Sequence, residues 1–284
     1  MFDTHLHCEF STDGKMSFPE AQAAARRLGI GIILTEHWDY DFPGHADWFL
    51  FDRDEYFRRN SPYRRPTQGT DAAANAGTTG SGGPATAGPA TAAPVLLGLE
   101  LGMQPHLAEK EEQVPVGYPF DYVIGSIHML NRQDLYQPET YDGLTRDEAL
   151  RQYLEQSIAS VTNHDNFDSL GHIDYICRYW PYAEKNFRPG EAAPLWDRLF
   201  RLLIEKDKAL EINTRRLDDP AAVRSLLPLY RRYAALGGRY CTIGSDAHEA
   251  AHVGRRLTAA ADIAAAAGLD IVYYEARQRH PDTL

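Results

Sequence analysis

The sequence has few cysteines and no long apolar run. Its 284 residues include three cysteines, Cys8, Cys177 and Cys241, too few and too far apart for a disulfide framework or a paired-cysteine zinc site. We expect them to be reduced, with Cys177 and Cys241 as small buried hydrophobes. No apolar run approaches the roughly 20 residues of a membrane span, and the N-terminus lacks the basic and apolar regions of a signal peptide. These absences predict a cytoplasmic protein that does not bind membranes.

Basic residues are scarce relative to acidic ones. The chain has 29 Lys and Arg against 40 Asp and Glu, a formal net charge of -11. This balance repels nucleic acid unless bound cations reverse the local sign, so we expect no nucleic-acid partner. A length of 284 residues is ordinary for one α/β barrel, and we expect a single domain spanning residues 1–284.

One segment, residues 67–94, has no aromatic and no branched aliphatic side chain. It reads TQGTDAAANAGTTGSGGPATAGPATAAP. Because so little apolar surface cannot offset the entropy lost on ordering, we predict a disordered low-complexity insertion at about 67–94. A mobile loop over an active site is the alternative.

Outside that segment, short apolar runs alternate with longer helical patterns. The candidate strands are Phe2–His7, Gly31–Thr35, Val95–Glu100, Tyr122–Ile127, Ser169–Ile173, Ala209–Asn213, Tyr240–Gly244 and Ile271–Tyr274. The candidate helices are Phe18–Leu28, Arg146–Val161, Glu191–Lys206, Pro220–Leu236 and Ala251–Ala266. Seven or eight strand–helix units in succession predict a parallel sheet that is closed, or nearly closed, as a barrel.

Imidazoles and carboxylates occur at the ends of these strands. They are His5, His7, Glu36, His37, Glu100, His128, His172, Asp246 and His248. A lone histidine at a strand end is usually a hydrogen-bonded structural residue, but six at successive ends indicate a shared role. Since the carboxyl ends of barrel strands meet on one face, we expect these side chains to form a metal site there.

The donor types indicate which metals fit. Histidine nitrogen and carboxylate oxygen without thiolate suit zinc, manganese or iron. The donors outnumber what one tetrahedral ion can bind, so we expect two or three divalent ions, with Glu100 as a shared carboxylate. Glu36 is ambiguous, because it could instead orient the neighbouring His37. Among the other five histidines, His106 is the candidate for a substrate contact.

Seven motifs, in this order, resemble the polymerase and histidinol phosphatase (PHP) family of metal-dependent phosphoesterases. They are DTHLHCEFSTDG, TEHWD, GLELGMQP, YVIGSIHMLN, LGHIDYICRY, LEINT and TIGSDAHEAAHVG. The resemblance implies a distorted (β/α)7 TIM-like barrel with the metal site at the carboxyl ends of its strands. The GHIDYICRY and GSIH stretches look most like the stand-alone histidinol-phosphate phosphatases, which implies hydrolysis of L-histidinol phosphate in histidine biosynthesis.

The resemblance also implies roles for individual residues. It implies three metal sites: His5, His7, Glu100 and Asp246 for one ion, Glu100, His128 and His172 for a second, and Asp13, His37 and His248 for a third. It implies that Asp246 and His248 act in catalysis and that Arg178 lies near the substrate phosphate. After EINT, relatives usually continue with a small residue, glycine, leucine and a basic residue, whereas this chain reads RRLDD. We expect either that Arg215 or Arg216 supplies the missing basic residue or that the preferred substrate differs.

Three other functions stay open at this point. Another PHP-type phosphoesterase could act on nucleotides or other small phosphomonoesters, although the acidic charge balance and the absence of alternating aromatic and basic residues weigh against oligonucleotides. An amidohydrolase-type enzyme also begins with HxH on its first strand, but it leaves Asp13, His37 and His248 unexplained. A metal-binding protein without catalytic activity is the third alternative.

Overall fold

The computed structural model describes residues 1–65 and 93–283, so most of the predicted 67–94 insertion lies outside the described residues. The strands are β1 (Phe2–Leu6), β2 (Gly31–Trp38), β3 (Val95–Gly102), β4 (Tyr122–Ser126), β5 (Met129–Leu130), β6 (Gln133–Asp134), β7 (Ser169–Leu170), β8 (Ala209–Asn213), β9 (Tyr240–Gly244), β10 (Asp270–Glu275) and β11 (Gln278–Pro281). The α-helices are α1 (Phe18–Leu28), α2 (Arg53–Asn60), α3 (Ala108–Glu111), α4 (Arg146–Asn163), α5 (Tyr175–Tyr179), α6 (Ala193–Glu205), α7 (Pro220–Ala235) and α8 (Leu257–Ala267).

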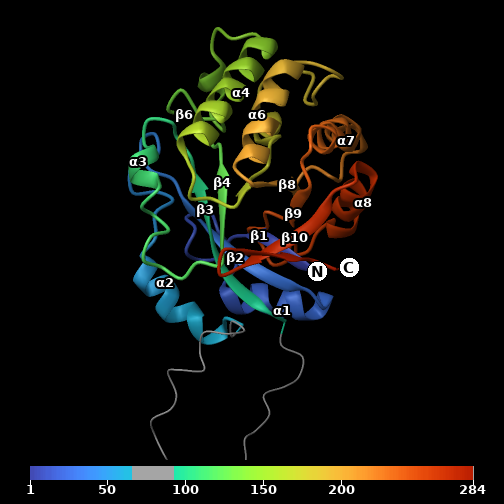
Figure 1. The fold of residues 1–284 in the computed structure, drawn as a ribbon. Helices are drawn as coiled ribbons and strands as arrows, with labels where there is room; N and C mark the ends of the chain where they lie inside the picture. Colours follow the sequence, from blue (N-terminus) through green and yellow to red (C-terminus); the bar gives the residue numbers. More distant parts are fainter. Residues whose placement is uncertain (66–92, 284) are drawn as a thin grey trace, which may run out of the picture.

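The main sheet of the described residues is a distorted (β/α)7 barrel. Its strand order is β1-β2-β3-β4-β7-β8-β9-β10-β11, and the first eight strands of this order pair in parallel. The barrel closes where Leu6 at the end of β1 forms a parallel bridge with Ala247 after β9. Figure 1 shows α4, α6, α7 and α8 outside the strands. The predicted barrel is therefore confirmed, with the β10–β11 hairpin added beside β9.

The closure lies at the carboxyl ends of the strands. The amide of Asp246 donates to the His5 carbonyl at 2.7 Å, and the amide of His7 donates to the Ala247 carbonyl at 2.8 Å. These two bonds hold the loop after β9 against β1. As a result, residues from β1 and from the loop after β9, which are far apart in the strand order, meet at one place.

Local sequence signals account for where α1 begins and ends. Ser17 and Glu20 form a capping box, and Gly29 ends the helix with a φ of 67°. The prediction for α8 was wrong at its start, because Gly254 and Arg256 have φ values of 73° and 59°. An α-helix cannot contain such residues, so it begins at Leu257 rather than Ala251.

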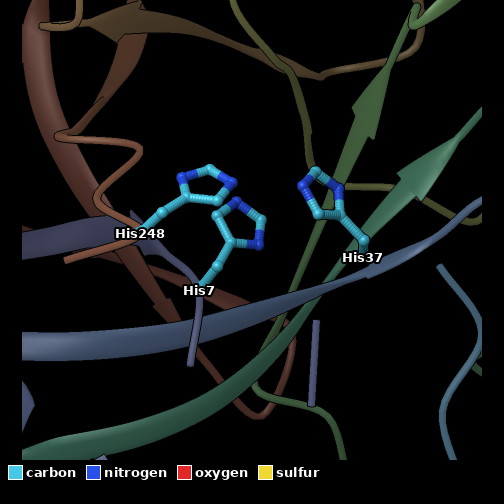
Figure 2. A group of neighbouring side chains, drawn as sticks. All are labelled: His7, His37 and His248. Carbon is cyan, nitrogen blue, oxygen red and sulfur yellow. The ribbon is translucent and has the colours of Figure 1, made fainter. Parts of the chain in front are cut away.

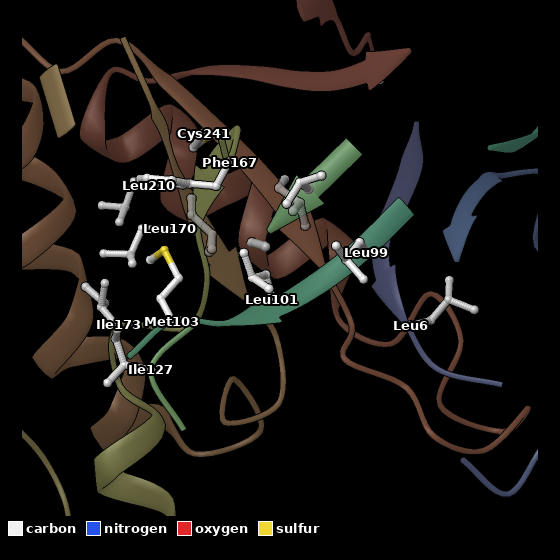
Figure 3. Close-up of a cluster of buried hydrophobic side chains, with 14 of the residues drawn as sticks. Leu6, Leu99, Leu101, Met103, Ile127, Phe167, Leu170, Ile173, Leu210 and Cys241 are labelled. Carbon is white, nitrogen blue, oxygen red and sulfur yellow. The ribbon is translucent and has the colours of Figure 1, made fainter. Parts of the chain in front are cut away.

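Apolar side chains from successive strands fill the space between the sheet and the helices. Figure 3 shows part of this cluster, in which Leu99, Leu101, Leu170, Leu210 and Cys241 are all buried. Burying each leucine stabilises the fold by about 1.5–3 kcal/mol relative to leaving it exposed. All three cysteines are free and buried, as the sequence predicts for the second and third of them.

The helices and the residues on either side of the undescribed segment give two further observations. Among the described helices, none has both the length and the apolar character needed to cross a membrane. The amide of Arg65 donates to the Val95 carbonyl at 2.8 Å, so the chain on either side of the undescribed residues meets beside β3.

Candidate metal centre

Strands β1, β2 and β3 bring the first group of donors together. His5 lies on β1 and His7 directly follows it, and the side chains of both are fully buried. Strand β2 continues to Trp38, three residues beyond the predicted end, so His37 lies within the strand. Its parallel partner in the register of β3 is Glu100. Pairing of neighbouring parallel strands therefore places an imidazole beside the buried carboxylate.

Five imidazoles surround the Glu100 carboxylate. The nitrogens near Oε2 are His37 Nδ1 at 2.8 Å, His5 Nε2 at 3.3 Å and His7 Nε2 at 3.4 Å. Those near Oε1 are His172 Nε2 at 2.7 Å and His128 Nε2 at 3.1 Å. Although burial opposes its ionisation, His5, His128 and His37 hold the pKa of Glu100 well below its usual range.

Glu100 has more polar neighbours than its carboxylate can accept hydrogen bonds from. Oε1 also accepts a 2.7 Å hydrogen bond from Ser126, and a carboxylate offers about four acceptor positions. Burial, reinforced by His37 and His248, lowers the pKa of His7 well below its usual range, which favours a neutral ring with a free nitrogen lone pair. Burial lowers the pKa of His172 as well, whereas neighbouring carboxylates raise the pKa of His5, His37 and His128 although burial opposes it. The carboxylates therefore favour positive charge at this centre, which protons supply in the metal-free protein and a divalent ion would supply when bound, and imidazole nitrogen with carboxylate oxygen is a donor set that divalent transition metals prefer.

His7, His37 and His248 form a second grouping, drawn in Figure 2. The ring centroids of His7 and His37 are 4.0 Å apart, and those of His7 and His248 are 4.4 Å apart. Asp13 joins this group, because its Oδ2 lies 3.0 Å from His248 Nε2 and its Oδ1 lies 3.7 Å from His37 Nε2. The structure therefore brings Asp13, His37 and His248 together, with His7 beside them.

Asp246 faces the first group from the loop after β9. Its Oδ1 lies 3.5 Å from His7 Nε2 and 3.9 Å from His5 Nε2. Its Oδ2 accepts a 2.7 Å hydrogen bond from Arg178 Nη1. Although burial opposes its ionisation, Arg178 and His5 hold the pKa of Asp246 well below its usual range. Asp246 is thus an ionised donor whose second oxygen is fixed by a guanidinium.

The donor atoms satisfy a simple geometric requirement for binding ions. In five groups of side chains they lie within 4.8 Å of one another: His7, His37 and His248; His5, His7 and Glu100; His5, His172 and Asp246; His37, Asp39 and His128; Glu100, His128 and His172. All nine side chains predicted as ligands lie in or against these groups. Their overlap through shared residues means that several ions could bind close together.

The four predicted substrate contacts differ in where they lie. Arg178 is buried beside Asp246, and Nη1 of the half-exposed Arg215 lies 3.2 Å from His248 Nδ1. Arg216 points elsewhere, because its guanidinium donates to Asp174 at 3.1 Å and to Asn186 at 2.6 Å. His106 is exposed and lines a separate surface hollow. The structure brings two of the four to the donors and leaves Arg216 and His106 away from them.

Two carboxylates that the sequence did not assign contact imidazoles predicted as ligands. Glu211 Oε1 lies 2.6 Å from His5 Nδ1, and its Oε2 accepts a 2.6 Å bond from the His172 amide. Asp39 Oδ1 lies 2.8 Å from His128 Nδ1. When an imidazole donates through Nδ1, its Nε2 lone pair is left for a metal. Glu211 lies in the motif LEINT and Asp39 in the motif TEHWD. The histidines that they contact are distant in sequence, so the motifs alone did not reveal these pairs.

Glu36 is linked to the predicted ligand His7 through the hydroxyl of Ser11. Ser11 Oγ donates to Glu36 Oε2 at 2.6 Å and lies 3.2 Å from His7 Nδ1. Both Glu36 oxygens also accept from the Cys8 amide at 3.1 Å. Burial raises the pKa of Glu36 to about 7 despite these bonds. Of the two roles considered from the sequence, the contacts favour an orienting role, directed through Ser11 to His7.

A cavity of about 330 Å³ opens beside the donors. Its lining includes Asp13, Asp39, His37 and His128 from the centre, and Asp134 from the β5–β6 hairpin. Aromatic side chains form much of the remaining wall: Phe42, Trp48, Phe49, Tyr136, Tyr175 and Tyr179. The cavity can therefore hold a small organic molecule with one end against the donor groups.

Comparison with known proteins identifies the family. The family model described as the PHP domain matches residues 3–215. The chain belongs to the PHP family. A probable histidinol-phosphatase from Clostridium acetobutylicum is 36% identical over 277 residues, covering 98% of each chain. A histidinol-phosphatase from Lactococcus lactis is 32% identical over 248 residues, covering 87% of this chain and 83% of the relative.

A solved PHP-family structure has the same fold. The crystal structure of histidinol phosphate phosphatase from Lactococcus lactis, complexed with zinc, L-histidinol and phosphate, matches with a TM-score of 0.83, 29% identity and 98% coverage of both chains. These similarities confirm the resemblance predicted from the motifs. They favour a metal-dependent phosphatase over an amidohydrolase-type enzyme and over a metal-binding protein without catalytic activity.

Proposed function

We infer that this PHP-family chain is a metal-dependent phosphatase that hydrolyses L-histidinol phosphate to L-histidinol and phosphate. The observation that carries this inference is the convergence of five imidazoles on the buried Glu100 carboxylate, in a chain similar over nearly its full length to histidinol-phosphatases. The cavity beside this centre has room for a small phosphomonoester. No observation on the described residues favours a nucleotide as substrate.

We propose two or three divalent ions, with zinc as the first candidate because the similar Lactococcus lactis structure contains it. The proposed ligand sets are His5, His7, Glu100 and Asp246; Glu100, His128 and His172; Asp13, His37 and His248. When bound, such ions lower the pKa of coordinated water and neutralise charge on a phosphoryl group. The overlap of the donor groups supports the shared role of Glu100.

Residues around the ligands prepare them for binding. Glu211 and Asp39 keep the Nδ1 protons of His5 and His128 in place, so the Nε2 atoms face the centre. Arg178 keeps Asp246 ionised and limits the negative charge of the site. Arg215, whose side chain is 43% exposed, extends beside His248 and can reach a phosphoryl oxygen at the mouth of the site. We also propose that Asp246 and His248 take part in catalysis, as the resemblance to the family implies.

A substrate panel tests the proposed function. The metal-loaded protein is assayed for phosphate release from L-histidinol phosphate, nucleoside monophosphates and sugar phosphates. We expect the highest kcat/KM for L-histidinol phosphate. A nucleotide hydrolysed at least about ten times more efficiently would favour the alternative phosphoesterase, since a ten-fold preference is about 1.4 kcal/mol of transition-state discrimination.

A further inference from the structure

The cavity beside the metal centre has walls suited to an organic cation. Three carboxylates and six aromatic side chains line it, and no lysine or arginine of the described chain does so. Aromatic faces and carboxylates both attract ammonium and protonated imidazole groups. L-histidinol carries an amine on the carbon next to its CH₂OH group and an imidazole at the end remote from its hydroxyl.

Two of the three carboxylates already have partners in the metal centre. Asp13 Oδ2 lies 3.0 Å from His248 Nε2. Asp39 Oδ1 lies 2.8 Å from His128 Nδ1. Their negative charge is directed toward imidazoles that we propose to bind ions, so neither is free for a substrate cation.

Asp134 is the third carboxylate and differs from the other two. Its side chain is buried, with the residue only 7% exposed, and its Oδ1 accepts a 2.9 Å bond from the Tyr136 amide. Across residues 1–65 and 93–283, no donor is hydrogen-bonded to its Oδ2 and no cation is paired with it. Because Oδ2 is not among the fully buried oxygens and Asp134 lines the cavity, a ligand there can reach it and supply the positive charge that the protein does not.

The hairpin that carries Asp134 fixes it close to a proposed metal ligand. Asp134 on β6 pairs with Met129 on β5, which directly follows His128. The amide of Leu135 donates to the His128 carbonyl at 3.1 Å. Asp134 therefore has a fixed position relative to the centre, as a residue that selects one part of a substrate requires.

We propose that Asp134 is the counter-ion for the ammonium group of the substrate, and that the site selects phosphate esters of amino alcohols. The aromatic wall accommodates the imidazole, with Tyr175 placed at its inner end, where its ring centroid lies 4.9 Å from that of His128. This inference rests on the proposed function, because it assigns the ammonium of L-histidinol phosphate, which is close to the ester oxygen, while the phosphate lies at the metal centre.

The first test compares two esters. The kcat/KM ratio of L-histidinol phosphate to p-nitrophenyl phosphate, which has no ammonium, is measured for the wild type and Asp134→Asn. We expect the ratio to fall by about 10- to 100-fold, because one charge-assisted hydrogen bond is lost for one substrate alone. Glu139→Gln is the matched control, since Glu139 is exposed nearby and lies outside the cavity. An unchanged ratio in Asp134→Asn would overturn the proposal.

The outcomes separate this inference from the proposed function. A wild type that hydrolyses p-nitrophenyl phosphate but not L-histidinol phosphate contradicts the proposed function, and the Asp134 inference with it. A second measurement needs no variant: inhibition of p-nitrophenyl phosphate hydrolysis by L-histidinol and by its analogue lacking the amine. L-histidinol should bind at least about ten times more tightly. Equal inhibition by the two alcohols would contradict an ammonium site.

Discussion

Replacing Glu211 with glutamine tests how the barrel orients its imidazoles. One oxygen of Glu211 lies 2.6 Å from His5 Nδ1, and the other accepts a 2.6 Å bond from the His172 amide. A glutamine has one oxygen and one NH₂ group, so it can accept from only one of the two donors. If its oxygen stays on the His172 amide, its NH₂ group faces Nδ1 and favours a proton on His5 Nε2. That nitrogen is the one that faces Glu100.

The size of the effect follows from this mismatch. If the amide oxygen instead faces His5 Nδ1, the buried His172 amide is left without an acceptor, which costs about 1–3 kcal/mol. Loss of a carboxylate that orients a metal-binding histidine lowers metal affinity by about 10- to 100-fold. We expect Glu211→Gln to bind at least one ion more weakly by that factor in competition with a chromophoric chelator. In the metal-free protein, burial lowers the pKa of His5 but Glu100 and Glu211 raise it well above its usual range, so a ¹⁵N NMR titration should find a lower His5 pKa in Glu211→Gln than in the wild type.

Glu111→Gln is the matched control for this experiment. Glu111 is also fully buried, and its Oε2 lies 2.7 Å from His164 Nε2 and accepts a 2.8 Å bond from the Gln104 amide. His164 belongs to none of the donor groups of the described chain. The control should lose stability but keep wild-type metal affinity. Wild-type metal affinity and an unchanged His5 pKa in Glu211→Gln would refute the orienting role.

Three further predictions concern arginines of the site and residues 67–94. Arg178→Ala should lower kcat/KM for L-histidinol phosphate by about 1.5–3 kcal/mol in steady-state assays, the range for a charged hydrogen bond, and an unchanged value would exclude a role in the site. Arg215→Ala should raise KM, whereas Arg216→Ala should leave the kinetics near wild type because Arg216 points away from the donors; the reverse order would contradict the geometry. Replacing residues 67–94 with a short Gly-Ser linker should leave the melting temperature and metal content nearly unchanged, while a large loss of kcat would support a mobile loop over the active site.

The order of strands and helices was predictable because it depends on short-range signals. The capping residues around α1 fix its bounds, and the alternation of apolar runs with helical patterns predicts the parallel barrel. Helix α2 (Arg53–Asn60) was missed because its apolar face has only Tyr56 and Phe57. Strand β7 has two residues where five were predicted, since the chain turns after Leu170 toward His172.

The proposed ligands could be found from the sequence because strand ends of a barrel converge. Their orienting partners could not, because they depend on register and side-chain direction across the barrel. Glu211 contacts His5 from 206 positions away, and Asp39 contacts His128 from 89 positions away. The different positions of Arg215 and Arg216 also follow from the turn after β8, which two adjacent arginines in a sequence do not specify.

The most direct test of the account is to measure metal content and phosphatase activity together in the wild type and in Glu100→Gln. The wild type should contain two or three divalent ions per chain by elemental analysis and release phosphate from L-histidinol phosphate. In Glu100→Gln at least one ion should be lost and kcat should fall by about 100-fold or more, because one carboxylate serves more than one proposed site. Full metal content with normal turnover in Glu100→Gln would contradict a centre built on Glu100.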